Sequence, residues 1–371
     1  MRKSLLNGLT PAQFLHRYWQ KKPLLARAGL PRFAPLITRR DLLDLARSPD
    51  TESRLIIRTG GRWQVTHGPF TRRDFAQLPT RNWTLLVQGV NHVLPQAQAL
   101  LAQFAFIPYA RLDDLMVSYA PPGGGVGPHF DSYDVFLLQG AGRRRWQIGS
   151  QRDLALVDGA PLKILRNFRA SREWELAPGD LLYLPPRCAH DGVAIEDCIT
   201  YSIGFRAPSA QDLCARFLEF VQDGLDAHGL YADPQLKPTR HPARIDRQLS
   251  RGLLRLLEGA RWNRSDMLRF IGMDLSTPKP HVVYVPPHRP LSPPAFAKAI
   301  VRHGLRLALP SILLYDTTAF YINGERWTVP ARARTRIRQL ADRRELPPAT
   351  VAAAALDTLH AWYRAGYVVT G

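Results

Sequence analysis

The stretch Pro121-Pro122-Gly123-Gly124-Gly125-Val126-Gly127-Pro128-His129-Phe130-Asp131 decides the fold and the chemistry of this chain. A loop rich in Gly and Pro leads into a predicted strand that carries a His-x-Asp pair. Residues two apart on a strand point to the same face of the sheet. We therefore expect His129 and Asp131 to converge on one point inside a β-barrel or sandwich.

A second stretch, residues 178–190, supplies a third candidate ligand. Its sequence, PGDLLYLPPRCAH, predicts a turn, a buried strand and a diproline turn before His190. If the strands pair antiparallel, His190 can join the His-x-Asp pair. Two histidines and one carboxylate on one face form the facial triad of non-haem Fe(II) oxygenases. Zinc sites more often hold three or four ligands in a tetrahedral cage.

Each of these features also has an ordinary explanation. A lone His on a strand is often a hydrogen-bonded core residue, a His-x-Asp pair arises by chance, and a Gly/Pro loop is commonly only a loop. Their conjunction within one β-rich region favours a metal site, and we predict His129, Asp131 and His190 as its ligands.

Three consecutive arginines, Arg143, Arg144 and Arg145, open the strand that follows a Gly-Ala-Gly turn. Because side chains alternate along a strand, either Arg144 alone or the pair of Arg143 and Arg145 points inward. An inward guanidinium is suited to gripping a carboxylate with two hydrogen bonds. Taken alone, the triplet is more typical of a solvated basic turn or a surface contact with phosphate.

The region around these stretches is predicted to be β-rich. Short apolar segments separated by Gly or Pro turns fill residues 54–206, which is typical of an all-β sandwich or barrel. The predicted strands are 83–87, 115–119, 133–139, 144–148, 173–176, 181–184 and 200–205. Apolar periodicity predicts helices at 10–20, 38–48, 210–228, 247–258, 265–272, 295–305, 334–344 and 349–364.

Composition sets broader limits. The 371 residues suggest two or three domains, and the formal net charge is +19. Only seven of the 50 basic residues are Lys, and the excess charge is spread over both halves, so nucleic-acid binding is possible but not favoured. Three cysteines without a CxxC pair argue against a disulfide framework. No apolar segment follows Arg2 and Lys3, and no membrane span is visible, so we expect a cytoplasmic protein.

The two ligand stretches resemble the cupin motifs. Residues 123–131 follow the first motif, with Asp131 in place of its second histidine, and residues 179–190 follow the second, with Arg187 where the motif has Gly. The usual cupin Glu is absent. These departures are similar to the JmjC-type 2-oxoglutarate oxygenases, in which a Lys or Arg lies fifteen residues after the first ligand, the position of Arg144 here.

The fuller pattern resembles the bacterial ribosomal oxygenases of the YcfD/RoxA type. The stretches GGGVGPHFDSYDVFLLQGAGRRRWQIG, YLPPRCAHDGVA and YSIGFRAPS carry the resemblance, together with the N-terminal FLHRYWQKKPLL. It implies an α+β fold whose JmjC/cupin double-stranded β-helix, or jelly roll, is joined to a helical dimerisation region and a C-terminal winged-helix-like domain. The expected units are 1–94 packing on the core, 95–208 for catalysis, 209–294 for dimerisation and 295–371 for the winged helix.

The resemblance also implies roles for residues. His129, Asp131 and His190 would bind Fe(II), and Arg144 would hold the distal carboxylate of 2-oxoglutarate, with O2 as the second co-substrate. Ser118 and Thr200 would also contact 2-oxoglutarate, and Tyr133 would line the substrate pocket.

The implied reaction is hydroxylation of C-3 of an Arg side chain in ribosomal protein uL16, by a homodimer. Because that substrate is itself basic, we expect local acidic groups such as Asp113, Asp114 and Asp134 to recognise it. Three alternatives stay open: a histidyl hydroxylase of another ribosomal protein, a cupin enzyme independent of 2-oxoglutarate, and a non-catalytic module. In the last, Arg332, Arg334, Arg336, Arg338, Arg343 and Arg344 would bind RNA phosphates.

Overall fold

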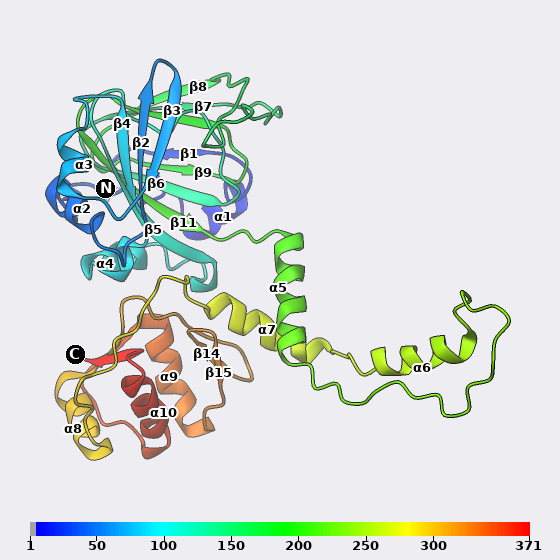
Figure 1. The fold of residues 1–371 in the computed structure, drawn as a ribbon. Helices are drawn as coiled ribbons and strands as arrows, with labels where there is room; N and C mark the ends of the chain where they lie inside the picture. Colours follow the sequence, from blue (N-terminus) through cyan, green and yellow to red (C-terminus); the bar gives the residue numbers. More distant parts are fainter. Residues whose placement is uncertain (1–4) are drawn as a thin grey trace.

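The computed structural model describes residues 5–371 as a β-rich catalytic domain, a helical region and a small C-terminal domain (Figure 1). Arg2 and Lys3 lie outside the described residues. Four short helices and two 3-10 turns accompany the β-rich part: α1 (Pro11–Arg17), α2 (Arg39–Leu45), α3 (Arg72–Ala76), α4 (Gln96–Ala102), η1 (Val90–His92) and η2 (Tyr109–Arg111).

The larger sheet has eight strands, and every neighbouring pair in it is antiparallel. In spatial order they are β1 (Leu24–Ala26), β9 (Leu181–Leu184), β6 (Asp134–Ala141), β11 (Cys198–Phe205), β5 (Leu112–Ala120), β4 (Trp83–Val87), β2 (Ser53–Thr59) and β3 (Arg62–His67). Strands β4, β7 and β9 have the predicted bounds, whereas β1, β10 and the β2–β3 hairpin were not predicted.

A smaller sheet of three strands faces the larger one. Its order is β10 (His190–Ala194), β7 (Arg144–Ile148) and β8 (Arg172–Leu176). Between the sheets lies a buried apolar cluster of Val135, Leu137, Trp146, Ile148, Leu176, Leu182 and Leu184. This is the double-stranded β-helix that the sequence predicts, and it is an open sandwich rather than a closed barrel.

The outer face of the larger sheet carries the main core. Strand alternation turns Phe136 and Leu138 outward into this core, while Val135 and Leu137 face the smaller sheet. Phe14 of α1 is fully buried against the outer face. Helices α1 and α2 begin at capping boxes built on Thr10 and Thr38, close to the predicted starts, although both end earlier than expected.

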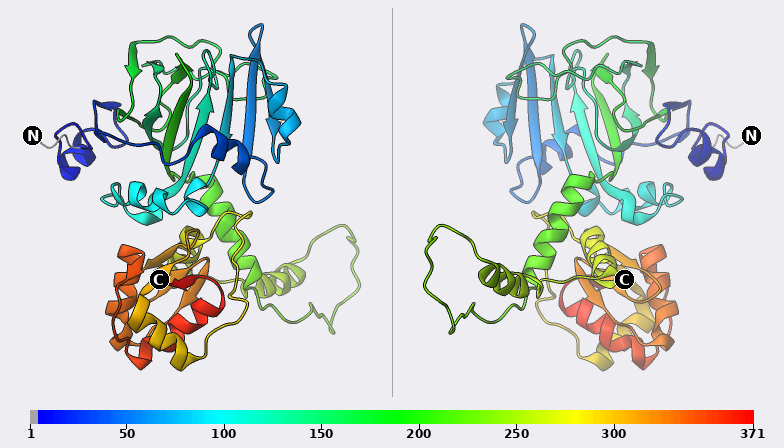
Figure 2. Two further views of the ribbon diagram at one scale, coloured as in Figure 1. Left: turned by 90° about the vertical axis from the view of Figure 1, so that its left-hand side faces the viewer. Right: turned by 90° about the vertical axis from the view of Figure 1, so that its right-hand side faces the viewer.

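Three helices follow the catalytic domain: α5 (Ala210–Asp223), α6 (Arg247–Leu257) and α7 (Arg264–Ser276). Helix α6 and the irregular chain around it extend away from the rest of the molecule (Figures 1 and 2). Helix α7 instead packs against the C-terminal domain, where Gly272 lies directly against the ring of Tyr321.

The C-terminal domain, which closes the chain, packs three helices around two small sheets and has its own buried core. The helices are α8 (Pro293–His303), α9 (Ala331–Arg343) and α10 (Ala353–Arg364). The strands are β12 (Leu305–Leu307), β13 (Leu313–Tyr315), β14 (Phe320–Ile322), β15 (Glu325–Trp327), β16 (Glu345–Leu346) and β17 (Val368–Thr370). The expected winged-helix-like fold is thus confirmed, while the predicted boundaries between units stay predictions.

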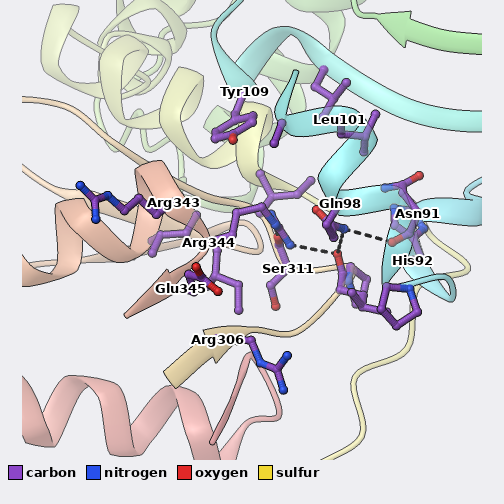
Figure 3. A pocket seen from close by; sticks show the side chains of 18 of the residues that line it. Asn91, His92, Gln98, Leu101, Tyr109, Arg306, Ser311, Arg343, Arg344 and Glu345 are labelled. Atoms are coloured by element: carbon purple, nitrogen blue, oxygen red, sulfur yellow. Dashed lines mark hydrogen bonds between the residues drawn. The ribbon is translucent and has the colours of Figure 1, made fainter. Parts of the chain in front are cut away.

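A cavity of about 360 Å³ separates the catalytic and C-terminal domains (Figure 3). Arg344 reaches across it to the loop after β12 and donates hydrogen bonds to the carbonyl oxygens of Ala308, Leu309 and Ser311. Gln98 of α4 lies within 3.5 Å of the same Leu309 carbonyl from the other side. The cavity is therefore bounded by a cross-domain contact and lies apart from the predicted metal ligands. Within residues 5–371 no helix has the length and apolar character needed to cross a membrane.

Candidate metal centre

The Gly-rich loop places His129 next to the smaller sheet. The backbones of Gly123 and Gly124 exchange hydrogen bonds of 2.8 and 2.9 Å with Ala194 at the end of β10. A Cβ on Gly125 would overlap the Gly192 carbonyl oxygen, so only Gly fits this close backbone approach. The loop therefore runs tightly along β10, and His129 arrives opposite His190, with which it exchanges two backbone hydrogen bonds.

The structure brings the three predicted ligands together. Potential ligand atoms of His129, Asp131 and His190 all lie within 4.8 Å of one another. The two imidazole ring centroids are 4.2 Å apart, and His190 Nε2 is 3.7 Å from Asp131 Oδ2. His190 is buried, while the other two side chains are half-buried. This arrangement leaves one side of the cluster open to further ligands.

Hydrogen bonds fix the orientation of both imidazoles. His129 Nδ1–H donates to the Gly127 carbonyl and His190 Nδ1–H donates to the Cys188 carbonyl, each at 2.8 Å. Each Nε2 therefore keeps its lone pair for a metal. Burial, reinforced by the nearby His129, lowers the pKa of His190 to about 4, so this imidazole is neutral near pH 7. Neutral imidazole is the form that binds metal.

The expected strand across His129 and Asp131 is not present. His129 forms an isolated bridge with His190, Asp131 lies in an irregular segment, and β6 begins only at Asp134. The Arg187 N–H donates to the Asp131 carbonyl at 2.7 Å. Arg187 has a φ of 63°, a left-handed conformation that Gly adopts more easily, which agrees with the Gly of the cupin motif at this position. Asp131 is thus placed by contacts between loops, and not by strand alternation.

The alternation of buried and exposed side chains along β7 decides which of the three arginines faces inward. Arg144, Trp146 and Ile148 are buried, whereas Arg143 and Arg145 are exposed, so Arg144 alone points inward. Its Nε and Nη2 atoms are buried and have no hydrogen-bond partner within the described chain. The guanidinium lies 5.7 Å from the ring of Trp146, which itself lies 5.8 Å from the ring of His190.

These contacts link the metal ligands through Trp146 to Arg144 in one interior region between the sheets, which we call the chamber. A buried guanidinium without a carboxylate partner is costly unless a ligand compensates it. A dicarboxylate that reaches from the metal ligands to Arg144 fits this donor set. Trp146, whose Nε1 is also buried without a partner, was missed in the sequence although it shares the face of Arg144.

Ser118 and Thr200 face the same chamber from the larger sheet. They are register partners in β5 and β11, and alternation turns them away from the outer core. The Thr200 hydroxyl donates to Gln139 Oε1 at 3.1 Å, and Ser118 Oγ is 3.5 Å from the Thr200 carbonyl. Arg54 of β2 is the register partner of Leu86 in β4, and Leu86 is the register partner of Ser118, so Arg54 lies in the same row across the sheet. Its buried Nε has no hydrogen-bond partner among the described residues. Sequence reasoning missed Arg54, although a charged residue next to the apolar run of β2 was a signal that could have found it. The co-substrate roles of Ser118 and Thr200 stay predictions.

Tyr133 lies at the mouth of this region. Its ring packs over Gly204 close to Asp113 and Asp114, and 38% of the residue is exposed. Together with Asp113 and Lys279 it lines a cavity of about 400 Å³. Tyr133 is therefore in a position that a substrate side chain can reach.

The three acidic groups predicted near the pocket divide into two kinds. Asp113 and Asp114 lie beside Tyr133, and Lys279 Nζ is 3.3 and 3.0 Å from their respective carboxylates. Asp134 points the other way. It is fully buried and bonded to the Tyr183 hydroxyl, the Gln20 amide and Arg111, so the expectation that it lies at the pocket was wrong.

The sequence matches three known domain families. Residues 99–213 match the JmjC domain, residues 259–368 match the ROXA-like winged helix, and residues 168–267 match the AraC-like ligand binding domain. The first match contains all three candidate metal ligands and Arg144.

Similar proteins and structures span most of the chain. An Escherichia coli protein named ribosomal protein uL16 3-hydroxylase is 36% identical over 321 residues, 86% of each chain. A Haemophilus influenzae protein named probable ribosomal oxygenase is 41% identical over 62% of this chain and 55% of its own. The structure of E. coli ycfD has a TM-score of 0.84 at 34% identity, covering 98% of both chains. A YcfD structure in complex with cobalt and 2-oxoglutarate has a TM-score of 0.81 with the same identity and coverage.

Proposed function

This chain belongs to the bacterial ribosomal oxygenase family, and on that premise we propose that it hydroxylates C-3 of an Arg side chain in ribosomal protein uL16. The reaction class is that of an Fe(II)- and 2-oxoglutarate-dependent oxygenase with a JmjC domain. The observation that carries the proposal is the chamber in which the two histidines and Asp131 lie at one end and the unpartnered Arg144 at the other.

The residues of the chamber fit the two groups that the reaction requires. His129, Asp131 and His190 offer the two neutral imidazoles and one carboxylate suited to Fe(II). Arg144 offers a fork of donors to the far carboxylate of 2-oxoglutarate. When bound, iron and 2-oxoglutarate with O2 supply the oxidising chemistry that inserts one oxygen atom into a C–H bond.

The chain itself provides position and exclusion of water. The carbonyls of Gly127 and Cys188 hold the two imidazoles in the orientation that leaves Nε2 free. The apolar cluster between the sheets keeps water from the Arg144 end of the chamber, which strengthens its interaction with a carboxylate.

We assign substrate recognition to the end of the chamber away from Arg144, where Asp131 is half-buried and Tyr133 is exposed. Tyr133 would pack against the incoming side chain, beside Asp113 and Asp114. Lys279 pairs with both carboxylates and Arg206 pairs with Asp113, so a basic substrate would have to compete with these two cations for the carboxylates.

The proposal is tested by mass spectrometry of uL16 after incubation with the protein, Fe(II) and 2-oxoglutarate. We expect one added oxygen atom on an Arg side chain, and none with Asp131→Ala. If uL16 gains no oxygen while metal binding is demonstrated, the proposal is wrong. Oxygen on a His side chain would indicate a histidyl hydroxylase, and turnover without 2-oxoglutarate would indicate a different cupin enzyme.

We also propose that the protein is a cytoplasmic homodimer. A ribosomal protein as substrate and three free cysteines are consistent with the cytoplasm. Helix α6 supports the dimer, because its leucines are exposed on an arm that extends away from the rest of its own chain (Figure 2). A second copy of the chain would cover this apolar surface.

A further inference from the structure

Helix α9 of the C-terminal domain carries four arginines in one short run, Arg332, Arg334, Arg336 and Arg338. Arg332 is exposed and the other three are half-buried. Within residues 5–371 none of the four lies within ion-pair distance of a carboxylate. The helix therefore carries a concentrated positive charge, and its one acidic residue, Asp342, follows Arg338 by one turn and accepts hydrogen bonds from the Tyr315 hydroxyl.

This arrangement opposes the stability of the helix. Arg332 and Arg336 are four residues apart, as are Arg334 and Arg338, and like charges at this spacing repel. Arg332 and Arg334 also lie in the first turn of α9, where the helix dipole is positive and where neither an acidic residue nor a side-chain cap is present. The four arginines therefore do not stabilise the helix. An anionic partner bound to them would relieve both the repulsion between the like charges and the unfavourable interaction with the helix dipole.

Aromatic rings lie against two of the guanidinium groups. Arg334 lies 6.0 Å from the ring centroid of Phe320, and Arg338 lies 5.5 Å from that of Tyr315. The Nε atom of each is buried and has no described partner, while Arg334 donates to the Thr317 carbonyl at 3.0 Å. Stacking and this bond restrain long side chains before a ligand arrives, which reduces the entropy cost of binding.

We infer that the α9 surface binds the phosphate backbone of a nucleic acid through two pairs of arginines on opposite flanks of the buried helix face. Arg332 and Arg336 form one pair, and Arg334 and Arg338, which lie over Phe320 and Tyr315, form the other. Within each pair the two guanidinium groups are about one helical turn apart and can contact successive phosphates, and binding through them requires no base contacts. An acidic protein fits less well, because stable protein interfaces need an apolar centre. Of this surface's aromatic rings Phe320 is buried, which leaves Tyr315 as its exposed ring.

The test measures binding of labelled single-stranded RNA, duplex RNA and duplex DNA of one sequence to the full chain across a range of salt. The variant Arg332→Ala/Arg336→Ala removes two charges. We expect a roughly tenfold weaker affinity at 0.1 M salt and a salt slope for single strands that is smaller by about 1.4. The three nucleic acids separate RNA from DNA as the natural source of the phosphates.

The matched control is Lys237→Ala/Arg240→Ala, which removes the same charge from the exposed chain before α6. It separates local binding from the attraction of any polyanion to a chain of net charge +19. An equal loss of affinity in this control, or unchanged RNA binding by the α9 variant, would overturn the inference. Equally tight, α9-dependent binding of an acidic peptide would overturn it in favour of a protein partner.

A thermal unfolding measurement shows whether the α9 variant is folded. Because the substitution removes like-charge repulsion and introduces Ala, a better helix former, its melting temperature should match or exceed that of the unmodified chain. Weaker RNA binding by an equally stable variant supports the surface, whereas weaker binding that accompanies a lower melting temperature counts against it.

Discussion

Arg144 shows how a single residue connects the strand pattern with the chemistry. From the sequence, alternation left two orientations open for the triplet, and the burial pattern of β7 selects the one in which Arg144 faces the metal ligands. In that position its Nε and Nη2 lack partners. The guanidinium is therefore available to bind an anion, and without that anion its unpaired buried charge lowers the stability of the fold.

Replacing Arg144 tests this role directly. Arg144→Ala should weaken 2-oxoglutarate binding by about 100-fold or more, because a buried, charge-assisted pair of hydrogen bonds is lost. The 2-oxoglutarate affinity of Arg144→Lys should lie between those of Arg144→Ala and the unmodified chain, because an ammonium group keeps the charge but cannot form the same pair of hydrogen bonds. Calorimetric titration of 2-oxoglutarate into protein loaded with a redox-inert metal measures the effect.

The chain offers a matched control in the neighbouring Arg145, which is exposed on the opposite face of β7. Arg145→Ala removes the same charge and should leave 2-oxoglutarate affinity within about twofold. Metal content should be unchanged in both Ala variants. Unaltered 2-oxoglutarate affinity in Arg144→Ala would remove Arg144 from the proposed site.

At the scale of elements, the leucine-rich face of helix α6 is the clearest case of an exposed apolar surface within residues 5–371. Leu254 and Leu257 are 55% and 69% exposed, and Leu253 is also exposed. Apolar side chains of this size contribute about 1.5–3 kcal/mol each when fully buried. A second α6 arm that covers this face would make a stable contact between two copies.

Polar substitutions on α6 should therefore separate the dimer. We expect Leu253→Gln/Leu254→Gln/Leu257→Gln to weaken dimerisation by at least 100-fold, measured by sedimentation at micromolar concentrations. The control Leu230→Gln changes a Leu that is also exposed but lies outside the helix. A monomeric unmodified chain at these concentrations would contradict the homodimer itself.

The sheets were better predicted than the loops that complete the site. Strands such as β7 and β9 follow from short apolar runs between turn residues, and these runs fix which faces are buried. The segment from His129 to Asp131 looked like a strand because of its spacing. In the structure it is held by the bridge to His190 and by the hydrogen bond from Arg187, two contacts with distant parts of the chain.

At the scale of the whole molecule, His92 lies where the catalytic domain meets the segment that leads into the C-terminal domain. Burial lowers its pKa to about 4, and the positive charges of Lys279, His281 and Arg344 add to this effect, while Asp113 opposes it. The imidazole is therefore neutral in the folded protein near pH 7.

This shift predicts a loss of stability in mild acid. Because the pKa of His92 is lower in the folded state than the ordinary 6.5, its contribution is fully present above that value and falls as the pH drops toward 4. Between pH 7.5 and pH 5 we expect the free energy of unfolding to fall by about 1–2 kcal/mol through this residue. Chemical denaturation at the two pH values measures it.

His92→Gln should lack this component of the pH dependence. His67→Gln, which changes an exposed imidazole, should retain it and serves as the control. If His92→Gln loses as much stability on acidification as the unmodified chain, His92 is not the group responsible.

The sequence by itself determined the β-rich core and the three metal-ligand candidates, because these depend on local spacing and on residue types that only a few functions combine, and its resemblance to known oxygenases indicated the family and the reaction. The tertiary structure decided which Arg faces the chamber, that Asp134 is bonded within the core instead of lying at the pocket, and how Asp131 is held. These outcomes depend on which distant segments pack together, and a local pattern does not contain that information.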